Sequence, residues 1–431
     1  MSQSPPASES PPEVQRSLWR DGNFLTMWSG QAFAQFGGQI TELALPVLAV
    51  LLLHATEFEV GILNAAGTAA FLLIGLPAGA WIDRMRKRHV MIGADIIRAL
   101  ALVSLPLLWW AGHLQVWHLI VVALVMSVAT VFFDVSYQSI VPSLVRPAQI
   151  AEANGKLEST SQLAGIAGPA FGGWLIGILT APLAILITVG TYLVSAVALL
   201  RTRDSEHVSP ATEHDPLVRS IGEGLRWVFG NPYLRRIVGT TATSNFFSTI
   251  SFTLVPILIL RTLEITPQGM GLFFTVGAAG GLAGAIATPH IVRVIGEARA
   301  IPVSAIMFSV TALLLPVAAL VPAIALPFLL VQGFLGMFSV LVYNIVQVTF
   351  RQRVTPTRLL GRMNASIRFV VWGVMPIASL LAGGLGTWLG VVPTLWVGAI
   401  GALGSAVFVL TPRFWRMREL PLATEEATAA E

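Results

Sequence analysis

Gly79-Ala80-Trp81-Ile82-Asp83-Arg84-Met85-Arg86-Lys87-Arg88 is a dense cluster of charge between two long apolar runs. In the whole chain only 11% of the residues are charged and 55% are hydrophobic. Charges this scarce are expected where water is, or where a mechanism needs them. The stretch therefore predicts a short aqueous turn between two membrane helices, and the rest of the fold follows from the runs on either side of it.

Twelve apolar runs are long enough to cross a bilayer, whose core of about 30 Å needs roughly 20 residues per helix. They span approximately 24–53, 59–82, 89–111, 116–141, 155–179, 182–200, 234–260, 268–292, 299–320, 324–349, 365–388 and 391–411. The runs are continuously apolar rather than alternating, which favours helices over a closed barrel. The sequence predicts an all-α integral membrane protein with twelve transmembrane helices in two six-helix bundles.

The basic residues predict the orientation of these helices. With the N-terminus inside, nearly all Lys and Arg of the loops fall in cytoplasmic connections, and only Arg261 falls outside. Both termini are therefore expected in the cytoplasm and the chain in the plasma membrane. This topology accounts for the net charge of +4, so no nucleic-acid partner is expected. The absence of cysteine excludes disulfides and thiolate metal sites.

The longest internal polar stretch divides six helices from six. The predicted organisation is a disordered cytoplasmic tail (1–23), a first bundle (24–200), a central cytoplasmic loop (201–233), a second bundle (234–411) and a second tail (412–431). Within the central loop, residues 216–228 place apolar side chains on one face. We interpret them as an amphipathic helix, lying either on the membrane surface or in solvent as a linker.

A weak internal repeat supports the division into halves. Asp134 corresponds to Asn344 and Glu158 to Arg368, and Gly172-Gly173 falls near Gly383-Gly384 with a shift of one residue. Two halves in parallel repeat predict a central cavity at their interface near the membrane midplane.

The charged turn resembles the signature loop of the major facilitator superfamily, G-x-x-x-D-R-x-G-R-R. The matching residues are Gly79, Asp83, Arg84, Lys87 and Arg88, and Arg86 stands where the family has glycine. The resemblance implies that Asp83 caps or pairs with a helix of the other half in one state and releases it in the other. We call these five residues the conformational latch. A simple topological anchor of positive charge is the alternative.

A second pattern lies in the fifth apolar run. Gly165, Gly168, Pro169, Gly172 and Gly173 resemble the antiporter signature G-x-x-x-G-P-x-x-G-G, with one residue fewer between the first two glycines. Glycine permits close helix packing, and proline bends a helix. The resemblance implies an antiporter; generic glycine-mediated packing is the alternative. The segment 132–139 also resembles the branch of siderophore and macrolide exporters, although the fourth run lacks the R-x-x-x-G arginine of many drug antiporters.

Four acids lie within apolar runs, where ionisable groups are costly and usually functional: Glu42, Asp95, Asp134 and Glu158. Glu158 is near the inner end of its run and is expected in an interface salt bridge. Glu42 is the deepest, and burial disfavours its charged form, as a proton-coupling carboxyl requires. We predict proton coupling by Glu42 and Asp134, with Asp134 paired to Arg84 or Arg88; a hydrogen-bonded structural Glu42 is the alternative. Asp95 is expected to pair with Arg98 on its own helix.

Polar and aromatic side chains in several runs are candidates for a substrate cavity. They are Gln31, Gln35, Gln39, Asn245, Phe246, Tyr343, Asn344, Gln347, Arg368 and Trp372. The alternative is that the aromatic members face lipid or pack between helices.

The sequence thus predicts a secondary transporter, monomeric and surrounded by lipid, that exports hydrophobic or amphipathic small molecules in exchange for protons. The chain has no phosphate loop and no histidine pair at metal-ligand spacing, so no enzymatic activity, metal or cofactor is expected and the proton gradient supplies the energy. An uptake symporter or facilitator for a metabolite is the first alternative. A lipid-handling or receptor-like membrane protein is the second.

Overall fold

The structure is a computed structural model that describes residues 17–82, 84–204 and 217–419. It is all-helical in these ranges, and eleven of its helices are long and apolar enough to cross a membrane. The first group of helices comprises α1 (Gly22–Val47), α2 (Glu57–Leu73), α3 (Gly75–Ile82), α4 (Lys87–Trp110), α5 (Val116–Leu144), α6 (Ile150–Leu179) and α7 (Ala181–Arg201). The second comprises α9 (Pro232–Ile257), α10 (Pro267–Ile295), α11 (Glu297–Ala312), α12 (Leu314–Leu320), α13 (Ala325–Val354), α14 (Thr357–Leu389) and α15 (Val391–Ser405).

Two of the predicted continuous runs are broken by proline. The run 59–82 divides into α2 and α3 at Ile74, and the run 299–320 divides into α11 and α12 at Leu313. In each case a proline ring clashes with the carbonyl four residues earlier, which is where the first helix ends: Pro77 limits α2 and Pro316 limits α11. Helices α11 and α12 together are still long enough to cross the membrane as one segment, whereas α2 alone is too short.

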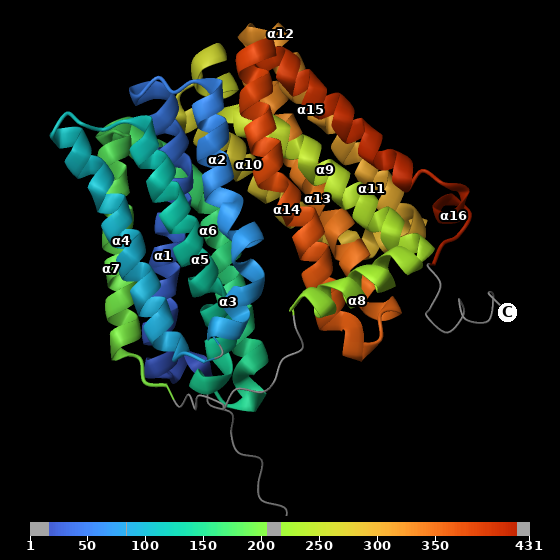
Figure 1. Cartoon of the computed structure of the whole chain (residues 1–431), viewed down its shortest axis with the longest axis horizontal. Coiled ribbons are helices and arrows are strands. Elements are labelled where there is room, and N and C mark those ends of the chain that lie inside the picture. The colour runs from blue at the N-terminus through green and yellow to red at the C-terminus, as the bar shows by residue number, and fades with distance from the viewer. Residues whose placement is uncertain (1–16, 83, 205–216, 420–431) are drawn as a thin grey trace, which may run out of the picture.

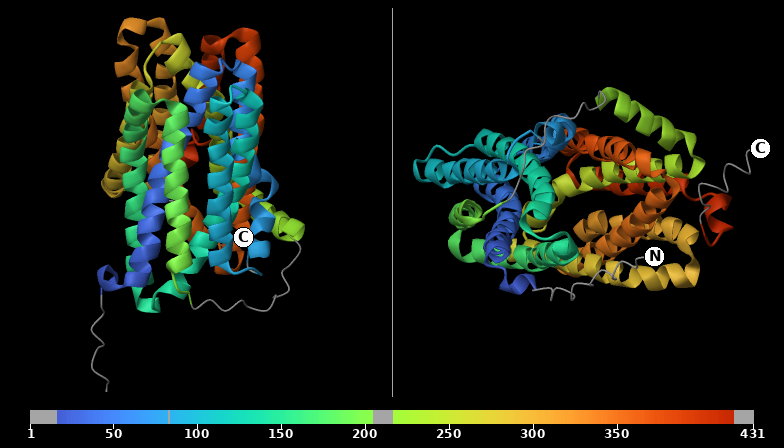
Figure 2. Two further views of the ribbon diagram at one scale, coloured as in Figure 1. Left: turned by 90° about the vertical axis from the view of Figure 1, so that its left-hand side faces the viewer. Right: turned by 90° about the horizontal axis from the view of Figure 1, so that it is seen from below.

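The two groups touch along two helix crossings at one end of the molecule and diverge toward the other (Figure 1). The crossings are α2 with α14 and α6 with α10. We call this the closed end; it contains the connections around residues 53–56 and 263–266. The opposite, open end contains the charged turn and the first and last described residues, and Figure 2 shows both groups around a common axis from below.

The internal repeat predicted from the sequence is visible in backbone geometry. Both α1 and α9 contain a proline near their ends and continue into a π-helical turn, Leu48–Leu52 and Leu258–Thr262. The residues that follow, His54 and Glu264, share a positive φ. Because these features recur at one constant offset, the two halves repeat the same local structure.

Helix α8 (Leu217–Gly230) confirms the helix predicted for 216–228 and settles its position in part. Gly224 lies against the main chain of Arg362 on α14, and Glu223 forms an ion pair with Arg362. Val228 is fully buried. Helix α8 therefore packs on the second group and is neither a free solvated linker nor held by lipid alone.

The predicted tails are shorter than the sequence suggested. Leu18 is fully buried and its amide donates to Glu152, so ordered structure begins before residue 24. Phe414 is fully buried on α16 (Pro412–Trp415), and Arg418 donates to the carbonyls of Arg293 and Val294. The prediction of a disordered tail concerns chiefly residues 1–16 and 420–431, which lie outside the described residues.

Candidate functional site

A cavity of about 350 Å³ lies between the two groups and is lined by α1, α6, α9, α10, α11, α13 and α15. Its volume is at the lower end of the range for small-molecule sites. Four of the predicted cavity residues line it: Gln39, Asn245, Tyr343 and Asn344. The second half supplies most of the wall, while α1 and α6 close the remaining side.

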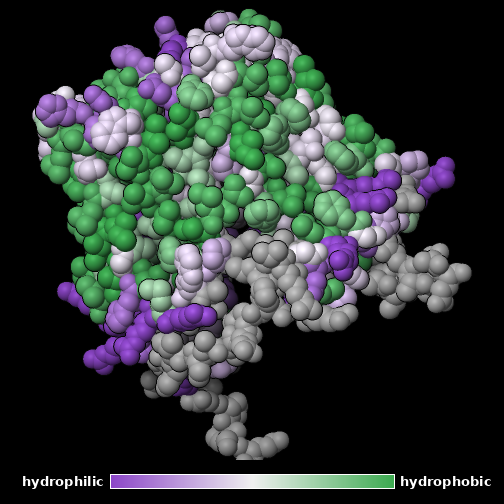
Figure 3. Space-filling view, in the orientation of Figure 1, coloured by the Kyte–Doolittle hydropathy of each residue, from purple (hydrophilic) through white to green (hydrophobic). Residues whose placement is uncertain are grey.

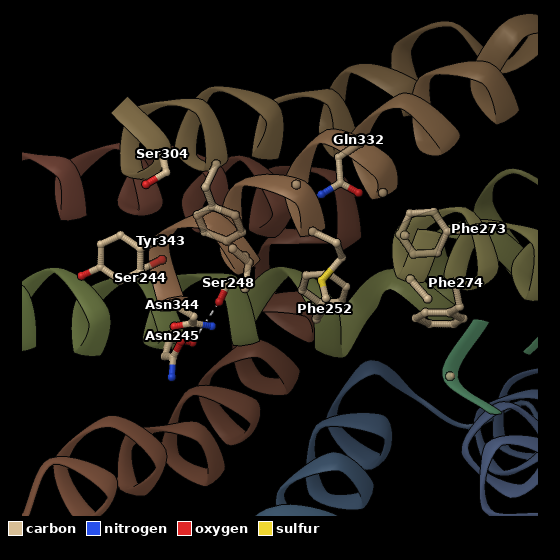
Figure 4. A pocket seen from close by; sticks show the side chains of 18 of the residues that line it. Ser244, Asn245, Ser248, Phe252, Phe273, Phe274, Ser304, Gln332, Tyr343 and Asn344 are labelled. Atoms are coloured by element: carbon tan, nitrogen blue, oxygen red, sulfur yellow. Dashed lines mark hydrogen bonds between the residues drawn. The ribbon is translucent and has the colours of Figure 1, made fainter. Parts of the chain in front are cut away.

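The cavity has a polar part and an aromatic part (Figure 4). Tyr343, Ser244, Ser304, Asn245 and Asn344 gather toward the open end. Phe273 and Phe274 on α10 lie toward the closed end, in edge contact at 5.1 Å between ring centroids. This arrangement suits a ligand with one polar and one apolar end.

Local hydrogen bonds fix the polar part. The Tyr343 hydroxyl lies 2.9 Å from Thr241 Oγ1 and donates to the carbonyl of Ile237 at 3.1 Å. The Asn245 Nδ2 donates to the carbonyl of Val371 on α14 at 3.1 Å. Since the partners of these two side chains lie in the second group, the polar wall is held by one half of the molecule.

Glu42 is the only charged residue among the described residues that line this cavity. Its side chain is exposed to the cavity, and within the described part of the chain no hydrogen bond or ion pair satisfies it. Pro46 lacks an N–H, so the main-chain carbonyl of Glu42 also loses its usual intrahelical donor. At the equivalent position of the repeat, four residues before Pro256, stands Phe252, which lines the same cavity. The acid is thus a feature of the first half alone.

The glycines of α6 allow α1 and α10 to pack unusually close to the backbone of α6. A Cβ on Gly168 would lie 2.5 Å from Gln39 Cβ, and one on Gly172 would lie 3.3 Å from Ile40 Cα. On another face, a Cβ on Gly173 would lie 2.7 Å from the carbonyl oxygen of Pro267. Gly165 and Pro169 line the cavity. This pattern therefore packs α6 against both halves, and its antiporter role stays a prediction.

Several predicted cavity residues lie elsewhere. Gln31 is buried inside the first group, where its Nε2 donates to Ser195 Oγ at 2.9 Å. Phe246 packs against Phe247, and Gln347 is buried near Asn344. Gln35 does not line the cavity either. Gln31 and Gln347 are buried away from the cavity, because polar side chains in a membrane helix also serve helix packing.

Arg368 and Trp372 on α14 also lie outside this cavity. The Arg368 guanidinium stacks over the Trp372 ring at 5.2 Å. Trp372 meets the edge of Phe71 on α2 at 5.1 Å, which is a contact between the two halves. The alternative weighed for the aromatic candidates, packing between helices, holds for Trp372.

Asp134 is half-buried on α5 and does not line the cavity. Its predicted pairing with Arg84 or Arg88 is wrong. Arg88 bonds the carbonyl of Thr202 and pairs with Asp204 at 3.5 Å. Arg84 is exposed, and among the described residues no ion pair joins it to Asp134. The basic group whose charge acts on Asp134 is Arg98. The prediction missed this because Arg98 comes from the interior of α4.

The predicted pair of Asp95 and Arg98 is confirmed, at 2.6 Å. Asp95 is fully buried, and its second oxygen accepts from Ser195 at 2.6 Å. The Arg98 guanidinium lies between the rings of Phe133 and Tyr192, at 4.1 and 4.6 Å. Asp95 and Ser195, with Gln31 joined to Ser195, thus connect α1, α4 and α7 in the core of the first group.

The predicted latch stands at the open end. Gly79 belongs to α3, Lys87 begins α4, and Arg84 is exposed. Asp83 lies outside the described residues, so its role stays a prediction.

Sequence reasoning missed much of the cavity wall: Ser244, Ser248, Phe252, Phe273, Phe274, Ser304, Phe308, Gln332 and Met337. A signal was available for some of them. Ser244 and Ser248 share a helix face with each other beside Asn245, and Gln332 is an isolated amide in an apolar run. The phenylalanines carry no such signal.

Comparisons with known proteins agree with this architecture. The chain is 27% identical to the multidrug efflux pump Tap of Mycolicibacterium fortuitum over 402 residues, which cover 90% of this chain and 95% of the relative. It is 23% identical to macrolide efflux protein A of Streptococcus pyogenes over 405 residues, 93% and 97% of the two chains.

Solved structures show the same fold. A bacterial homologue of the iron transporter ferroportin in the inward-facing state has a TM-score of 0.69 at 17% identity, over 92% of this chain and 99% of that one. The outward-facing form has a TM-score of 0.54 at 17% identity, over 90% and 98%. Residues 27–378 match the Major Facilitator Superfamily. With its apolar helices, this chain is a multi-pass membrane protein and belongs to the Major Facilitator Superfamily.

Proposed function

We propose that this protein exports amphipathic small molecules across the plasma membrane in exchange for protons. The observation that carries the proposal is the single carboxylate of Glu42 on the wall of an otherwise uncharged, half-aromatic cavity. A carboxylate in such surroundings attracts a proton or a cationic ligand, and one of them excludes the other. The names of the relatives, a multidrug and a macrolide efflux pump, support export over uptake.

The proposal includes an orientation and a state. The open end, with the charged turn and both ends of the described chain, faces the cytoplasm, because Lys and Arg concentrate there. Helices α2 and α3 together make the twelfth crossing. The described arrangement is then inward-open, which agrees with the higher TM-score against the inward-facing structure. The protein acts as a monomer without a cofactor and without a nucleic-acid partner.

In the cycle we propose, a cytoplasmic substrate enters the cavity from the open end and displaces the proton from Glu42. The two halves then rock, so that the closed end opens. A proton from outside neutralises Glu42, the substrate leaves, and the protonated carrier returns. One proton moving through ~100 mV supplies about 2.3 kcal/mol, to which a pH gradient adds.

The test uses purified protein in sealed proteoliposomes loaded with a fluorescent cationic amphipath. We expect Glu42→Gln to abolish transport driven by a pH gradient, since an amide cannot release a proton, and Glu42→Asp to keep part of it. Glu158→Gln is the matched control, because Glu158 is exposed on α6 and bonded to Gln162, away from the cavity. Full gradient-driven transport by Glu42→Gln would refute proton coupling at this residue.

The alternative of an uptake symporter is tested in the same vesicles. Imposing pH gradients of either sign distinguishes the two directions: an exporter accumulates substrate against the proton movement, a symporter with it. If purified protein binds a ligand and moves none in either direction, a receptor-like function replaces transport.

A further inference from the structure

A second hollow, of about 790 Å³, lies on the first group between α4 and α5, apart from the central cavity. On α4 it is lined by His89, Val90, Gly93, Ala94 and Ile97, which recur on one helix face. Met85 and Arg86, which directly precede α4, complete this side. On α5 it is lined by Leu124, Val125, Val128, Ala129 and Phe132. Ile97 and Leu124 are exposed, so the groove opens sideways from the bundle.

The groove has a basic mouth and an apolar interior. Arg86 and His89 are exposed at the open end, and within the described ranges no hydrogen bond or ion pair occupies either side chain. Its other lining residues are uncharged. Figure 3 shows hydrophilic residues gathered below the hydrophobic surface on this side of the molecule. Arg86 is also the residue by which the charged turn departs from the family pattern.

The depth of the groove matches one leaflet. From Arg86, the N-cap residue of α4, to Ile97 the lining positions rise about 16 Å at 1.5 Å per residue. Half of a bilayer core of about 30 Å is about 15 Å. The basic mouth then lies at the level of lipid headgroups while the apolar part extends to the middle of the bilayer.

We propose that this groove binds one anionic phospholipid, with its phosphate at Arg86 and His89 and an acyl chain between α4 and α5. Basic pockets between membrane helices attract anionic headgroups in this way. Gly93 keeps the groove open, since nothing lies within 4 Å of where its Cβ would be. This inference rests on the membrane location and does not depend on export or on proton coupling.

The site adjoins the proposed latch. Phe132 of the groove stacks on Trp81 of α3 at 6.2 Å, and Arg86 belongs to the charged turn itself. A bound lipid would therefore contact the segment that joins α3 to α4.

The experiment uses full-length protein in detergent micelles with trace palmitoyl-oleoyl phosphatidylglycerol that carries a photoreactive diazirine on its acyl chain. The phosphatidylcholine analogue is the headgroup control. We expect cross-links in peptides of α4 and α5, stronger for phosphatidylglycerol. Arg86→Gln is expected to weaken the binding of phosphatidylglycerol roughly fivefold, which is about the contribution of one basic residue near an anionic membrane surface. Arg86→Lys should retain that binding, because it keeps the positive charge.

Two glycine variants test the apolar part. Gly93→Leu fills the groove and should remove cross-links to α4 and α5 with either lipid. Gly190→Leu is the control, since Gly190 is an exposed glycine on α7 with equally open surroundings. Melting temperatures without added lipid verify that each variant is folded. If phosphatidylglycerol and phosphatidylcholine label alike and Arg86→Gln changes nothing, or if Gly93→Leu leaves the labelling intact, the proposal is wrong. The proposal would also be wrong if labelling of α4 and α5 disappeared when two copies of the chain associate, because the groove would then bind a second copy and not a lipid.

Discussion

The two crossings that close the molecule are equivalent in the internal repeat, yet they differ in chemistry. At the first, a Cβ on Gly61 of α2 would lie 2.8 Å from Gly383 Cα on α14. At the second, a Cβ on Gly271 of α10 would lie 3.2 Å from Gly173 Cα on α6. In each, a glycine early in one helix meets a glycine late in another, so both halves use the same device for close approach.

The neighbours of these glycines make the difference. Beside the first crossing, Asn64 Nδ2 donates to Thr253 Oγ1 at 2.8 Å and to Ser379 Oγ at 2.9 Å, which joins α2 to α9 and α14. The position equivalent to Asn64 is Phe274, which lies in the aromatic part of the cavity beside the second crossing. One crossing is therefore fastened by polar bonds, while the other shapes the substrate cavity.

The largest expected effect comes from removing close approach itself. Gly61→Leu and Gly173→Leu each place a side chain within 2.7 Å of a carbonyl oxygen of the other half, so the closed end cannot form without backbone shifts. We expect more than tenfold loss of transport. The chain has no cysteine, so spin labels can be attached specifically at Trp117→Cys and Leu320→Cys. Pulsed electron paramagnetic resonance then measures the distance between the two halves.

The matched control for Gly61 is Gly67→Leu on the same helix, where a Cβ meets nothing within 4 Å. It should leave both transport and the label distance near wild type. An unchanged distance in Gly61→Leu and Gly173→Leu would mean that the crossings are not the contacts that close this end.

A smaller effect is expected from Asn64→Leu, which removes two bonds of about 1 kcal/mol each. The cost stays near that sum, because Thr253 and Ser379 keep bonds to the carbonyls of Thr249 and Met375 and are not left unsatisfied. The equilibrium should shift away from the closed arrangement by at most about thirtyfold, which corresponds to about 2 kcal/mol. The measurement is the fraction of molecules with a longer distance between the same two spin labels.

Phe274→Leu tests the other side of the comparison. It should leave the label distances unchanged and alter the KM for transport, since Phe274 lines the cavity. If Asn64→Leu changed only KM and Phe274→Leu changed only the distances, the assignment of the two crossings would be reversed.

The sequence predicted these helices well, because apolar length and basic turns report the membrane directly. It missed the breaks at Ile74 and Leu313, since Pro77 and Pro316 interrupt the hydrogen-bond ladder without interrupting the apolar run. It found Glu42 because an acid within an apolar membrane helix is rare and usually functional.

The candidate cavity was predicted less completely, for a geometric reason. Gln31, Gln35 and Gln39 are spaced by four residues. On a helix of 3.6 residues per turn, each such step rotates the side-chain direction by about 40° around the helix axis. Gln39 therefore faces the cavity while Gln31 turns into the first group. Phe273 and Phe274 could not be predicted, because the sequence does not distinguish a phenylalanine that lines a cavity from one that packs in the core.

The smallest effect is expected from the ion pair at the closed end, which also belongs to the first crossing alone. Arg261 Nη1 lies 3.7 Å from Glu57 Oε1, with 36% and 25% of the two side chains exposed. Such a pair contributes at most about 1 kcal/mol and weakens in salt. The second guanidinium nitrogen donates to the carbonyl of Ala55 at 2.7 Å, so Arg261 does more than neutralise Glu57.

Glu57→Gln should therefore shift the label distances less than Arg261→Gln, and only at low salt. The double variant should behave as Arg261→Gln alone, because the carboxylate acts through the guanidinium. Additive effects of the two substitutions would show instead that Glu57 holds the closed end by another contact, such as its packing against Gly386 on α14. Polar fastening of the first crossing would then extend from Asn64 to the end of α14, and the contrast with the second crossing would become sharper.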